Sequence, residues 1–407
     1  MEYIRFGELY STPSSNGVSR PSAVRGEGYK MINMGELFAN DIIRDIPMER
    51  VKLSEKEKAR FLVEEDDLLF ARQSLVASGA GKCSIVRELN EETTFESHLI
   101  RVRLNKDIVN PWYYYYLFQL PYNPVKTIVN QCAQAGIRGT ELVKIKVPVP
   151  SIEVQNKVAN VLSVYDELIE NNNKRIKLLE QMAENLYKEW FVRFRFPGYE
   201  SAEFENGIPK GWEYVKLGDI LSFDRGISYS SEEIDCEDGL NLINLKNIEA
   251  FGGFRRDGTK KYNGKYKEPQ VVKKGDLVLG VTDMTQDRRT VGSVALIPTI
   301  EGISVISADL VKVKSELPNI YLYALCRYGF YSKYFSQFAN GANVLHLKPN
   351  TLLNKKLLLP TMDLIALFVN KTTPIIELID KLNLDNDNLT KQRNLLLPRL
   401  MSGKLEV

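Results

Sequence analysis

The feature that most constrains the fold is an internal repeat of about half the chain. Residues Tyr3–Ser11 (YIRFGELYS) match Tyr214–Ser222 (YVKLGDILS) at an offset of 211 positions, and His98–Val102 (HLIRV) matches Asp309–Val313 (DLVKV) at the same offset. Collinear matches at a nearly constant offset indicate a tandem duplication. Each copy is much longer than a solenoid unit, so we expect each to fold as a domain of its own.

Each copy opens with a part of mixed secondary structure. Its first ~150 residues are punctuated by Gly, Pro and Asn between short β-rich runs, which predicts a strand-rich α+β domain. A proline commonly begins a helix, and Pro111 and Pro318 predict helices over Tyr113–Leu120 and Tyr321–Phe330. The predicted strands are Asp67–Phe70, Leu99–Leu104, Leu277–Val281, Ser293–Ile297 and Ala308–Val313.

The first copy then ends in a long helical segment. Residues 152–194 contain neither Pro nor Gly, and apolar residues recur there at a 4-3-4-3 spacing that reappears 210 positions later. A heptad spacing calls for a partner helix, and a polar residue in such a seam fixes its register. We therefore predict that the two helices pair, with independent helices lying on their own domains as the alternative. The predicted seam is Tyr165, Ile169, Asn172, Ile176, Leu179, Ala183, Leu186 and Trp190 on the first helix, and Ile375, Ile379, Leu382, Asn386, Leu389, Arg393, Leu396 and Leu400 on the second.

Composition narrows the class of protein. A chain of 407 residues with 44% apolar and 26% charged residues predicts two or three folded domains, and a net charge of +2 neither demands nor excludes a nucleic-acid partner. No apolar run approaches the ~20 residues of a membrane helix, and Met1–Ser15 lacks an apolar export signal, so we expect a cytoplasmic protein without membrane contact. The four cysteines, which fit a reducing compartment because no two form a C-x-x-C pair, are Cys83, Cys132, Cys236 and Cys326.

Catalytic motifs are missing. The sequence has no [DE]-x-K triplet of a Mg²⁺-dependent nuclease, and its two histidines, His98 (in a strand-like run) and His346, leave little for acid–base catalysis or metal binding. Gly79–Lys82 (GAGK) is followed by Cys83 in place of Ser or Thr, so we reject a phosphate-binding loop. Asn110–Tyr113 (NPWY) is better explained as a helix start than as an amino-methyltransferase motif. We expect no catalytic residue, no metal and no cofactor in this chain.

Polar segments that differ between the copies remain as candidates for recognition. They are predicted as loops over Ser11–Arg25, Arg72–Lys82 and Asn130–Thr140 in the first copy, and over Asp224–Glu232, Thr282–Arg289 and Asn340–Lys348 in the second. Such side chains contact base edges and phosphates, whereas ordinary solvated loops are the alternative. The candidate DNA-binding residues are Ser14, Ser15, Arg20, Arg25, Arg72, Gln73, Lys82, Gln134 and Arg138, with Arg225, Tyr229, Thr282, Gln286, Arg288, Arg289, Asn343, His346 and Lys348 in the second copy.

A basic run in the second copy adds to these candidates. Residues Arg255–Lys274 hold eight Lys and Arg against two acidic residues. Such a run suits the phosphate backbone of DNA, and we expect it to contribute to binding.

The arrangement of these segments resembles the specificity subunit of type I restriction–modification systems. The resemblance rests on Ile208–Glu213 (IPKGWE) with Leu217–Asp219 (LGD) before the second copy, on Val147–Pro150 with Gln155 leading into the long helix, and on the closing Leu400–Gly403 (LMSG). It covers essentially the whole chain. Two segments depart from the family pattern. The first copy lacks the P-x-G-W segment, and Leu358–Asp363, which leads into the second long helix, lacks the family's Glu-Gln.

The resemblance implies an architecture and partners. It implies an α+β fold with two tandem target-recognition domains (1–150 and 199–360) and two helical regions (151–198 and 361–407) that form an antiparallel coiled coil with pseudo-two-fold symmetry. It also implies double-stranded DNA, two methyltransferase subunits carrying S-adenosylmethionine, and two restriction subunits using ATP and Mg²⁺ as partners.

The length of the predicted helices agrees with the recognition of a DNA sequence in two parts. The seam from residue 165 to residue 190 would span ~38 Å at ~1.5 Å per residue, against ~34–36 Å for one turn of B-DNA. We therefore predict a non-catalytic subunit that recognises an asymmetric bipartite DNA sequence. A diverged methyltransferase or nuclease, and a protein–protein adaptor that does not bind DNA, are the alternatives.

Overall fold

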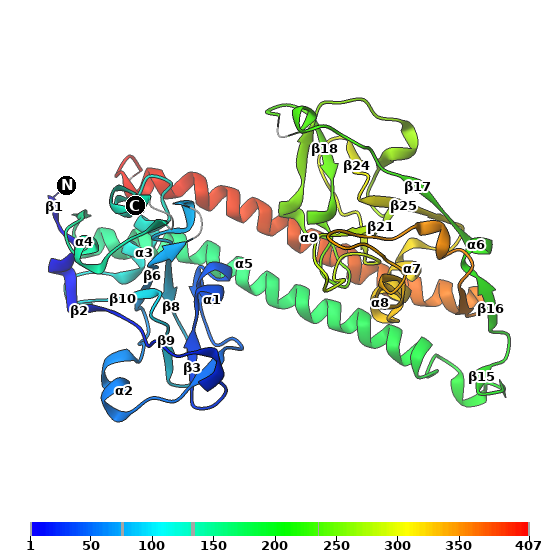
Figure 1. Cartoon of the computed structure of the whole chain (residues 1–407), viewed down its shortest axis with the longest axis horizontal. Helices are drawn as coiled ribbons and strands as arrows, with labels where there is room; N and C mark the ends of the chain where they lie inside the picture. The colour runs from blue at the N-terminus through cyan, green and yellow to red at the C-terminus, as the bar shows by residue number, and fades with distance from the viewer. Residues whose placement is uncertain (1, 75–76, 132–134, 235, 406–407) are drawn as a thin grey trace. The chain divides into compact units, whose positions relative to one another are not determined.

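The chain folds into two compact units. The computed structural model describes residues 2–74, 77–131, 135–234 and 236–405. Unit 1 comprises residues 1–169 and 388–407, and unit 2 comprises residues 170–387. Each unit therefore contains one copy of the repeat together with a part of each long helix (Figure 1).

Unit 1 is built on a five-stranded sheet. Its strand order is β2-β10-β6-β8-β4, and the order of a second sheet is β5-β3-β9. The strands are β1 (Glu2–Arg5), β2 (Tyr10–Asn16), β3 (Tyr29–Ile32), β4 (Ile42–Ile43), β5 (Glu49–Val51), β6 (Leu68–Ala71), β7 (Gln73–Ser74), β8 (Cys83–Val86), β9 (Thr93–Phe95), β10 (Leu99–Leu104), β11 (Asn130–Gln131), β12 (Ala135–Gly136) and β13 (Lys146–Val149). The helices include α1 (Met34–Ala39), α2 (Glu55–Phe61), α3 (Pro111–Gln119) and α4 (Gly139–Leu142).

Unit 2 repeats this topology. Its main sheet has the order β17-β25-β21-β23, and a second sheet has the order β19-β18-β24-β20. The strands are β14 (Phe204–Glu205), β15 (Ile208–Pro209), β16 (Glu213–Lys216), β17 (Leu221–Arg225), β18 (Leu240–Ile243), β19 (Lys260–Tyr262), β20 (Val271–Val272), β21 (Leu277–Gly280), β22 (Thr282–Asp283), β23 (Val294–Leu296), β24 (Ser304–Ile306), β25 (Leu310–Ser315), β26 (Leu345–His346) and β27 (Lys356–Leu359). The helices of this domain include α6 (Leu217–Ile220), α7 (Asn319–Tyr328) and α8 (Tyr331–Ser336).

The strand pairings confirm the duplication. The first strand of each copy pairs antiparallel with the last, as β1 with β13 and β16 with β27. A parallel pair also recurs in each copy, between β3 and β9 and between β18 and β24. The two copies therefore share one fold, as the repeat predicts, and the five predicted strands all form.

The helices predicted after Pro111 and Pro318 also form. In α3 the Asn110 side chain accepts a hydrogen bond from the amide of Trp112 at 2.9 Å, so the NPWY segment is a helix start, as predicted. The second helix, α7, ends at Tyr328 rather than Phe330. Phe330 has a positive φ of 65°, which interrupts the helix before α8 begins.

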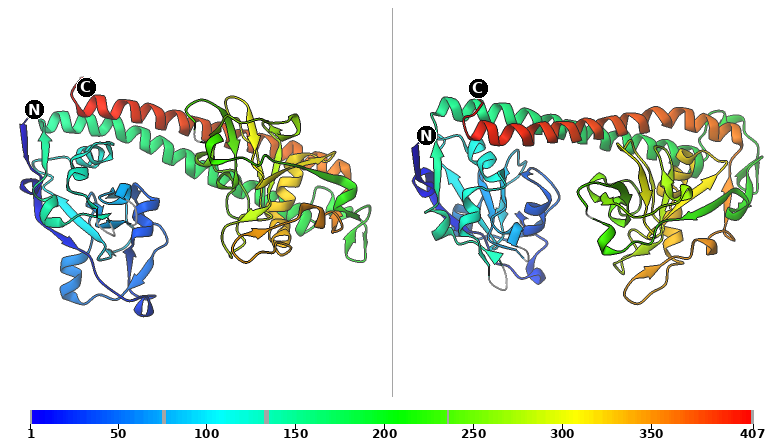
Figure 2. Two further views of the ribbon diagram at one scale, coloured as in Figure 1. Left: turned by 45° about the horizontal axis from the view of Figure 1, so that its top comes forward. Right: turned by 90° about the horizontal axis from the view of Figure 1, so that it is seen from above.

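Two long helices carry the predicted seams. The first is α5 (Ile152–Tyr187), which continues into a π-helical turn over Lys188–Val192, and the second is α9 (Met362–Met401). Every predicted seam position is buried or half-buried. The alternative of two unpaired helices is wrong, because α5 and α9 pack side by side within each unit (Figure 2).

The helix pairing is antiparallel. In unit 1 the Asp166 carboxylate of α5 forms an ion pair with Arg393 of α9. In unit 2 Asn172 donates to the Asn386 side chain at 2.9 Å, and the Tyr187 and Phe368 rings lie 6.0 Å apart. Thus the two seam asparagines bind each other, as expected of polar residues that set the register of paired helices.

The segment that leads into α5 is held by one glutamine. The Gln155 side chain is fully buried, donates to the carbonyl of Pro150 at 2.9 Å and accepts from the amide of Asn110 at 2.9 Å. The equivalent residue of α9, 210 positions later, is Ile365, which is also fully buried. The segment that leads into α9 therefore has a buried apolar contact where the segment that leads into α5 has hydrogen bonds. This explains why the second copy does not need the glutamine.

Candidate nucleic-acid interface

The polar segments that differ between the copies lie together in each domain. In the first copy, residues of two predicted loops pair through β7 and β12, with Gln73 opposite Gly136. In the second copy the corresponding strands β22 and β26 pair, with Thr282 opposite His346. Each domain thus joins two of its variable segments at an equivalent place, and we call each such group a loop cluster (the described residues 72–74, 77–82, 130–131 and 135–140 in the first copy, and 282–291 and 340–348 in the second).

The remaining variable segment of each copy, Ser11–Arg25 or Asp224–Glu232, contains a close backbone approach. Val18 bridges to Glu96 in the first copy, and Ile227 bridges to Ser307 in the second. The preceding glycines have no room for a side chain, because a Cβ on Gly17 or Gly226 would lie 2.0 Å from a backbone oxygen of the facing segment. Glycine is therefore required at both places for steric reasons.

A buried carboxylate organises the segment after β22. Asp283 is 2% exposed and accepts hydrogen bonds from the amides of Thr285 (2.9 Å) and Thr290 (2.8 Å). Burial raises the pKa of Asp283, but the hydrogen bonds from the Thr290 and Thr285 amides outweigh it and hold the pKa at about 2. The charged carboxylate therefore holds together the two ends of the loop that carries Met284 and Arg289, both of which are exposed.

This loop is also tied to the neighbouring segment. Gln286 donates to the carbonyl of Ala342 at 2.8 Å, and Arg288 donates to the carbonyl of Ser336 at 3.0 Å. These two predicted DNA-binding side chains therefore serve to shape the loop cluster in the structure.

Several predicted segments are not loops. Ser14 and Ser15 lie on β2, which pairs with β10, and Arg225 is the last residue of β17. Thr282 lies on β22 and is buried, with its hydroxyl donating to Asp309 at 2.8 Å. The loop assignment is wrong at these positions because each segment completes a strand ladder.

Histidine 98 also differs from expectation. It lies in an exposed turn just before β10 rather than in a strand, and its Nδ1 is 3.0 Å from the Gln73 side-chain oxygen. His346 is exposed on β26, in the loop cluster of the second copy. Neither histidine has the burial expected of a core residue.

Four predicted DNA-binding cations are engaged by carboxylates. Each forms an ion pair inside its own domain, which leaves less of its charge for a phosphate. These pairs are Arg20–Glu57 (2.6 Å), Arg25–Glu49 (2.5 Å), Lys82–Asp41 (2.9 Å) and Arg289–Asp287 (2.9 Å).

Three other cations are available. Arg138, Arg225 and Lys348 are exposed and have no ion pair with any residue that the structure describes. Arg72 donates to the carbonyl of Ser97 at 3.4 Å, so it is bound without a neutralising charge. The free cations therefore come from both copies, at the edge of the variable segments. Among the other predicted positions, Tyr229 is half-buried, Asn343 is exposed, and Gln134 lies outside the described residues.

Part of the basic run Arg255–Lys274 forms ion pairs within the protein. Lys274 and Arg256 contact the Asp380 carboxylate of α9 at 3.0 and 3.5 Å, and Arg256 also binds Asp387 at 2.8 Å. This attachment could not be predicted from the sequence, because the acidic partners lie more than a hundred positions away. Lys265, Lys267 and Lys273 remain exposed.

We expect the free arginine Arg138 to contribute more to DNA binding than the paired Arg20. Replacing Arg138 with alanine should cost about 1–3 kcal/mol of binding free energy, because it removes an uncompensated cation. Arg20→Ala is the matched control, since its charge is already neutralised by Glu57. Mobility-shift titrations of the assembled complex at two salt concentrations measure both, and a larger loss for Arg20→Ala would contradict the assignment.

The described parts of the chain hold neither a metal centre nor a membrane helix. Across residues 2–74, 77–131, 135–234 and 236–405, no three His, Cys, Asp or Glu side chains are grouped to bind a metal ion. None of the helices in these ranges is long and apolar enough to span a bilayer.

Comparisons with known proteins agree with this picture. Residues 21–181 match the family described as the type I restriction modification DNA specificity domain. The chain is 30% identical over 322 residues to the type I restriction enzyme MjaIX specificity subunit of Methanocaldococcus jannaschii, covering 74% of this chain and 71% of that protein. It is 24% identical over 384 residues to the MjaVIII specificity subunit of the same organism, covering 91% and 86%. The crystal structure of a type I restriction–modification S subunit from M. genitalium has the same fold, with a TM-score of 0.57 and 13% identity over 98% of this chain and 95% of that chain.

Fold and site together define a protein with two similar domains, each bearing its own variable loop cluster, and with two long paired helices. The chain belongs to the specificity subunits of type I restriction–modification systems. We call its two strand-rich domains the first and second target-recognition domains from here on.

Proposed function

We propose that this chain recognises an asymmetric bipartite DNA sequence and catalyses no reaction itself. The observation that carries the proposal is that one scaffold occurs twice, with unlike residues at equivalent places. Gln73 opposite Gly136 corresponds to Thr282 opposite His346. Because different side chains contact different base edges, each target-recognition domain would recognise a different half-site.

The proposal includes partner subunits. Two methyltransferase subunits would supply S-adenosylmethionine, and two restriction subunits would supply ATP and Mg²⁺ chemistry. The duplicated scaffold supports a pair of similar docking places, one on each copy. In this proposal α5 and α9 act as the spacer between half-sites, which the ~38 Å of helix between residues 165 and 190 supports.

Exchange of one domain tests the proposal. Replacing residues 1–150 with the corresponding domain of another specificity subunit should change one half-site and leave the other unchanged, because the strand ladders of the two domains are separate. Mapping of methylated adenines in cells that carry the exchanged protein measures this. A change in both half-sites would show that the domains do not act independently.

The other two hypotheses have their own tests. Transfer of a labelled methyl group from S-adenosylmethionine to DNA by the purified chain alone would support the diverged methyltransferase and contradict our proposal. Failure of the assembled complex to bind duplex DNA in a salt-dependent manner would support the protein–protein adaptor.

A further inference from the structure

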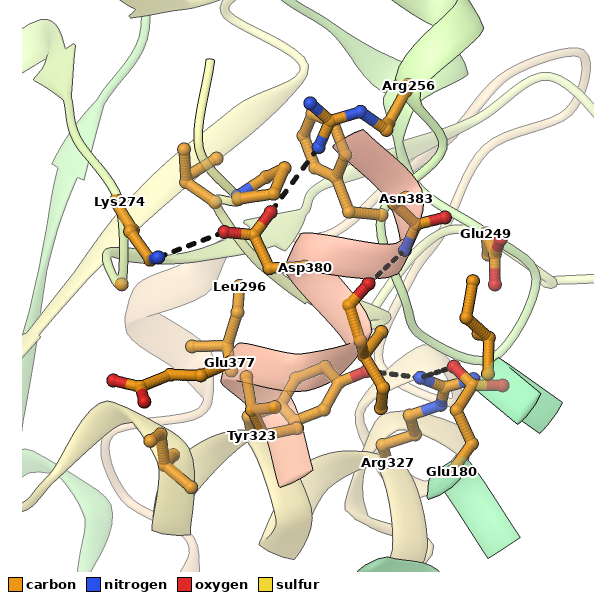
Figure 3. Close-up of a pocket in the computed structure, with 18 of the residues that line it drawn as sticks. Glu180, Glu249, Arg256, Lys274, Leu296, Tyr323, Arg327, Glu377, Asp380 and Asn383 are labelled. Carbon is orange, nitrogen blue, oxygen red and sulfur yellow. Dashed lines mark hydrogen bonds and ion pairs between the residues drawn. The ribbon is translucent and has the colours of Figure 1, made fainter. Parts of the chain in front are cut away.

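A large cavity lies in unit 2 between the second target-recognition domain and the two long helices. Its volume is about 570 Å³, within the range of small-molecule sites. The walls come from α5, α7 and α9, from the β23 strand and from the loops around residues 249–256 and 274–275. Figure 3 shows the side chains that line it.

The cationic side chains of this cavity are already neutralised. Arg327 forms an ion pair with Glu180 at 3.0 Å and also donates to the Tyr323 hydroxyl. At the other wall, Lys274 and Arg256 share the Asp380 carboxylate. An anionic ligand would therefore have to break existing ion pairs.

Two carboxylates of the cavity, in contrast, have no partner. Within the part of the chain that the structure describes, neither Glu249 nor Glu377 forms an ion pair or a side-chain hydrogen bond. Burial raises the pKa of Glu249, although Arg327 opposes the shift. Glu249 is half-buried, and a half-buried carboxylate without a partner is unfavourable, so a bound cation would relieve this cost; Glu377 is exposed, at the rim of the cavity.

The two free carboxylates lie at opposite sides of the cavity. In Figure 3 Glu249 and Glu377 are well separated, and Asn383 lies on the side of Glu249. The Asn383 amide nitrogen donates to the carbonyl of Ile379 at 3.0 Å, so its side-chain oxygen is the group left to accept a hydrogen bond. Apolar side chains that line the same cavity are Ile176, Phe254, Leu296, Ile297, Pro298, Ile320, Ile376 and Ile379.

We propose that this cavity binds a linear polyamine, with one ammonium group at Glu249 and Asn383 and another at Glu377. The methylene chain between the ammonium groups would cover the apolar wall. A linear polyamine matches the positions of these groups. Its ammonium groups carry hydrogen-bond donors and positive charge to the places where acceptors and negative charge are free. An occupant would touch both α9 and the second target-recognition domain, and would thereby strengthen their attachment.

Calorimetric titration of the full chain with spermidine, in the absence of DNA and at physiological salt, tests the proposal. We expect one saturable site, and we expect Glu249→Gln to weaken binding at least tenfold. Asn383→Asp should strengthen binding several-fold by adding a second carboxylate. Both variants are isosteric, and Glu249→Gln should raise or leave unchanged the melting temperature because it removes an unpaired buried charge.

Two controls separate this site from general charge attraction. Glu268→Gln removes an exposed carboxylate of the same domain that does not line the cavity, and it should leave the affinity unchanged. 1,8-Octanediol, which has a methylene chain but no charge, should not bind. The absence of saturable binding, equal affinity for Glu249→Gln, or equal losses for Glu249→Gln and Glu268→Gln would each overturn the proposal.

Discussion

Replacement of Asp166 by alanine is expected to lower the free energy of unfolding by about 3–5 kcal/mol, one of the largest effects of any single change in this protein. Asp166 is 8% exposed, forms an ion pair with Arg393 and accepts a hydrogen bond from the Tyr116 hydroxyl at 2.6 Å. Without the carboxylate, a half-buried guanidinium and a buried hydroxyl both lose their partner. Urea unfolding followed by circular dichroism measures the loss.

The other copy of the repeat supplies the control for this prediction. At the positions equivalent to Asp166, Arg393 and Tyr116, unit 2 has Ile376, Ala183 and Ala324, which belong to one apolar cluster. The triple variant Asp166→Ile, Arg393→Ala and Tyr116→Phe removes both charges and the buried hydroxyl, as in that apolar layer, so it should recover most of the lost stability. If the triple variant is as unstable as Asp166→Ala, then the unpaired guanidinium and hydroxyl are not the cause.

Replacement of Asp283 by alanine is expected to remove recognition of the second half-site, with a loss of DNA affinity of roughly 100-fold or more. The change leaves the amides of Thr285 and Thr290 without their acceptor, at about 1–3 kcal/mol each, and the loop that carries Met284 and Arg289 should become disordered. Titrations with DNA in which one half-site at a time is altered measure the effect. Discrimination at the first half-site should be unchanged.

A neighbouring residue and pH provide the controls for Asp283. Asp287→Asn alters an exposed carboxylate of the same loop and should leave the loop ordered, since Asp287 pairs only with the exposed Arg289 among the residues that the structure describes. The pKa of Asp283 is held at about 2, below its ordinary value of 3.8. The stabilisation by its carboxylate should therefore be complete above pH ~4 and be lost as the pH falls toward 2. Loss of second half-site discrimination in Asp287→Asn alone would contradict the role given to Asp283.

Part of the candidate site followed from sequence, and part did not. The differing polar segments located both loop clusters, because variable loops on a duplicated scaffold stand out between matching segments. The free and the paired cations could not be told apart, since the partner of Arg20 is 37 positions away and the partner of Arg25 is 24 positions away. The role of Asp283 was also missed, because a polar residue among other polar residues gives no sign of burial.

The sequence by itself determined the duplication, the strand-rich domains and the pairing of α5 with α9, because apolar periodicity and repeat offsets are local and collinear properties. Only the tertiary structure decided which charges are available to a ligand. Ion pairs such as Asp166 with Arg393, or Lys274 with Asp380, join residues that are distant in sequence, and they form because folding buries each carboxylate beside a cation, where water screens the attraction less. Among the residues that the structure describes, Glu249 is left without an ion pair or a side-chain hydrogen bond, beside an apolar wall.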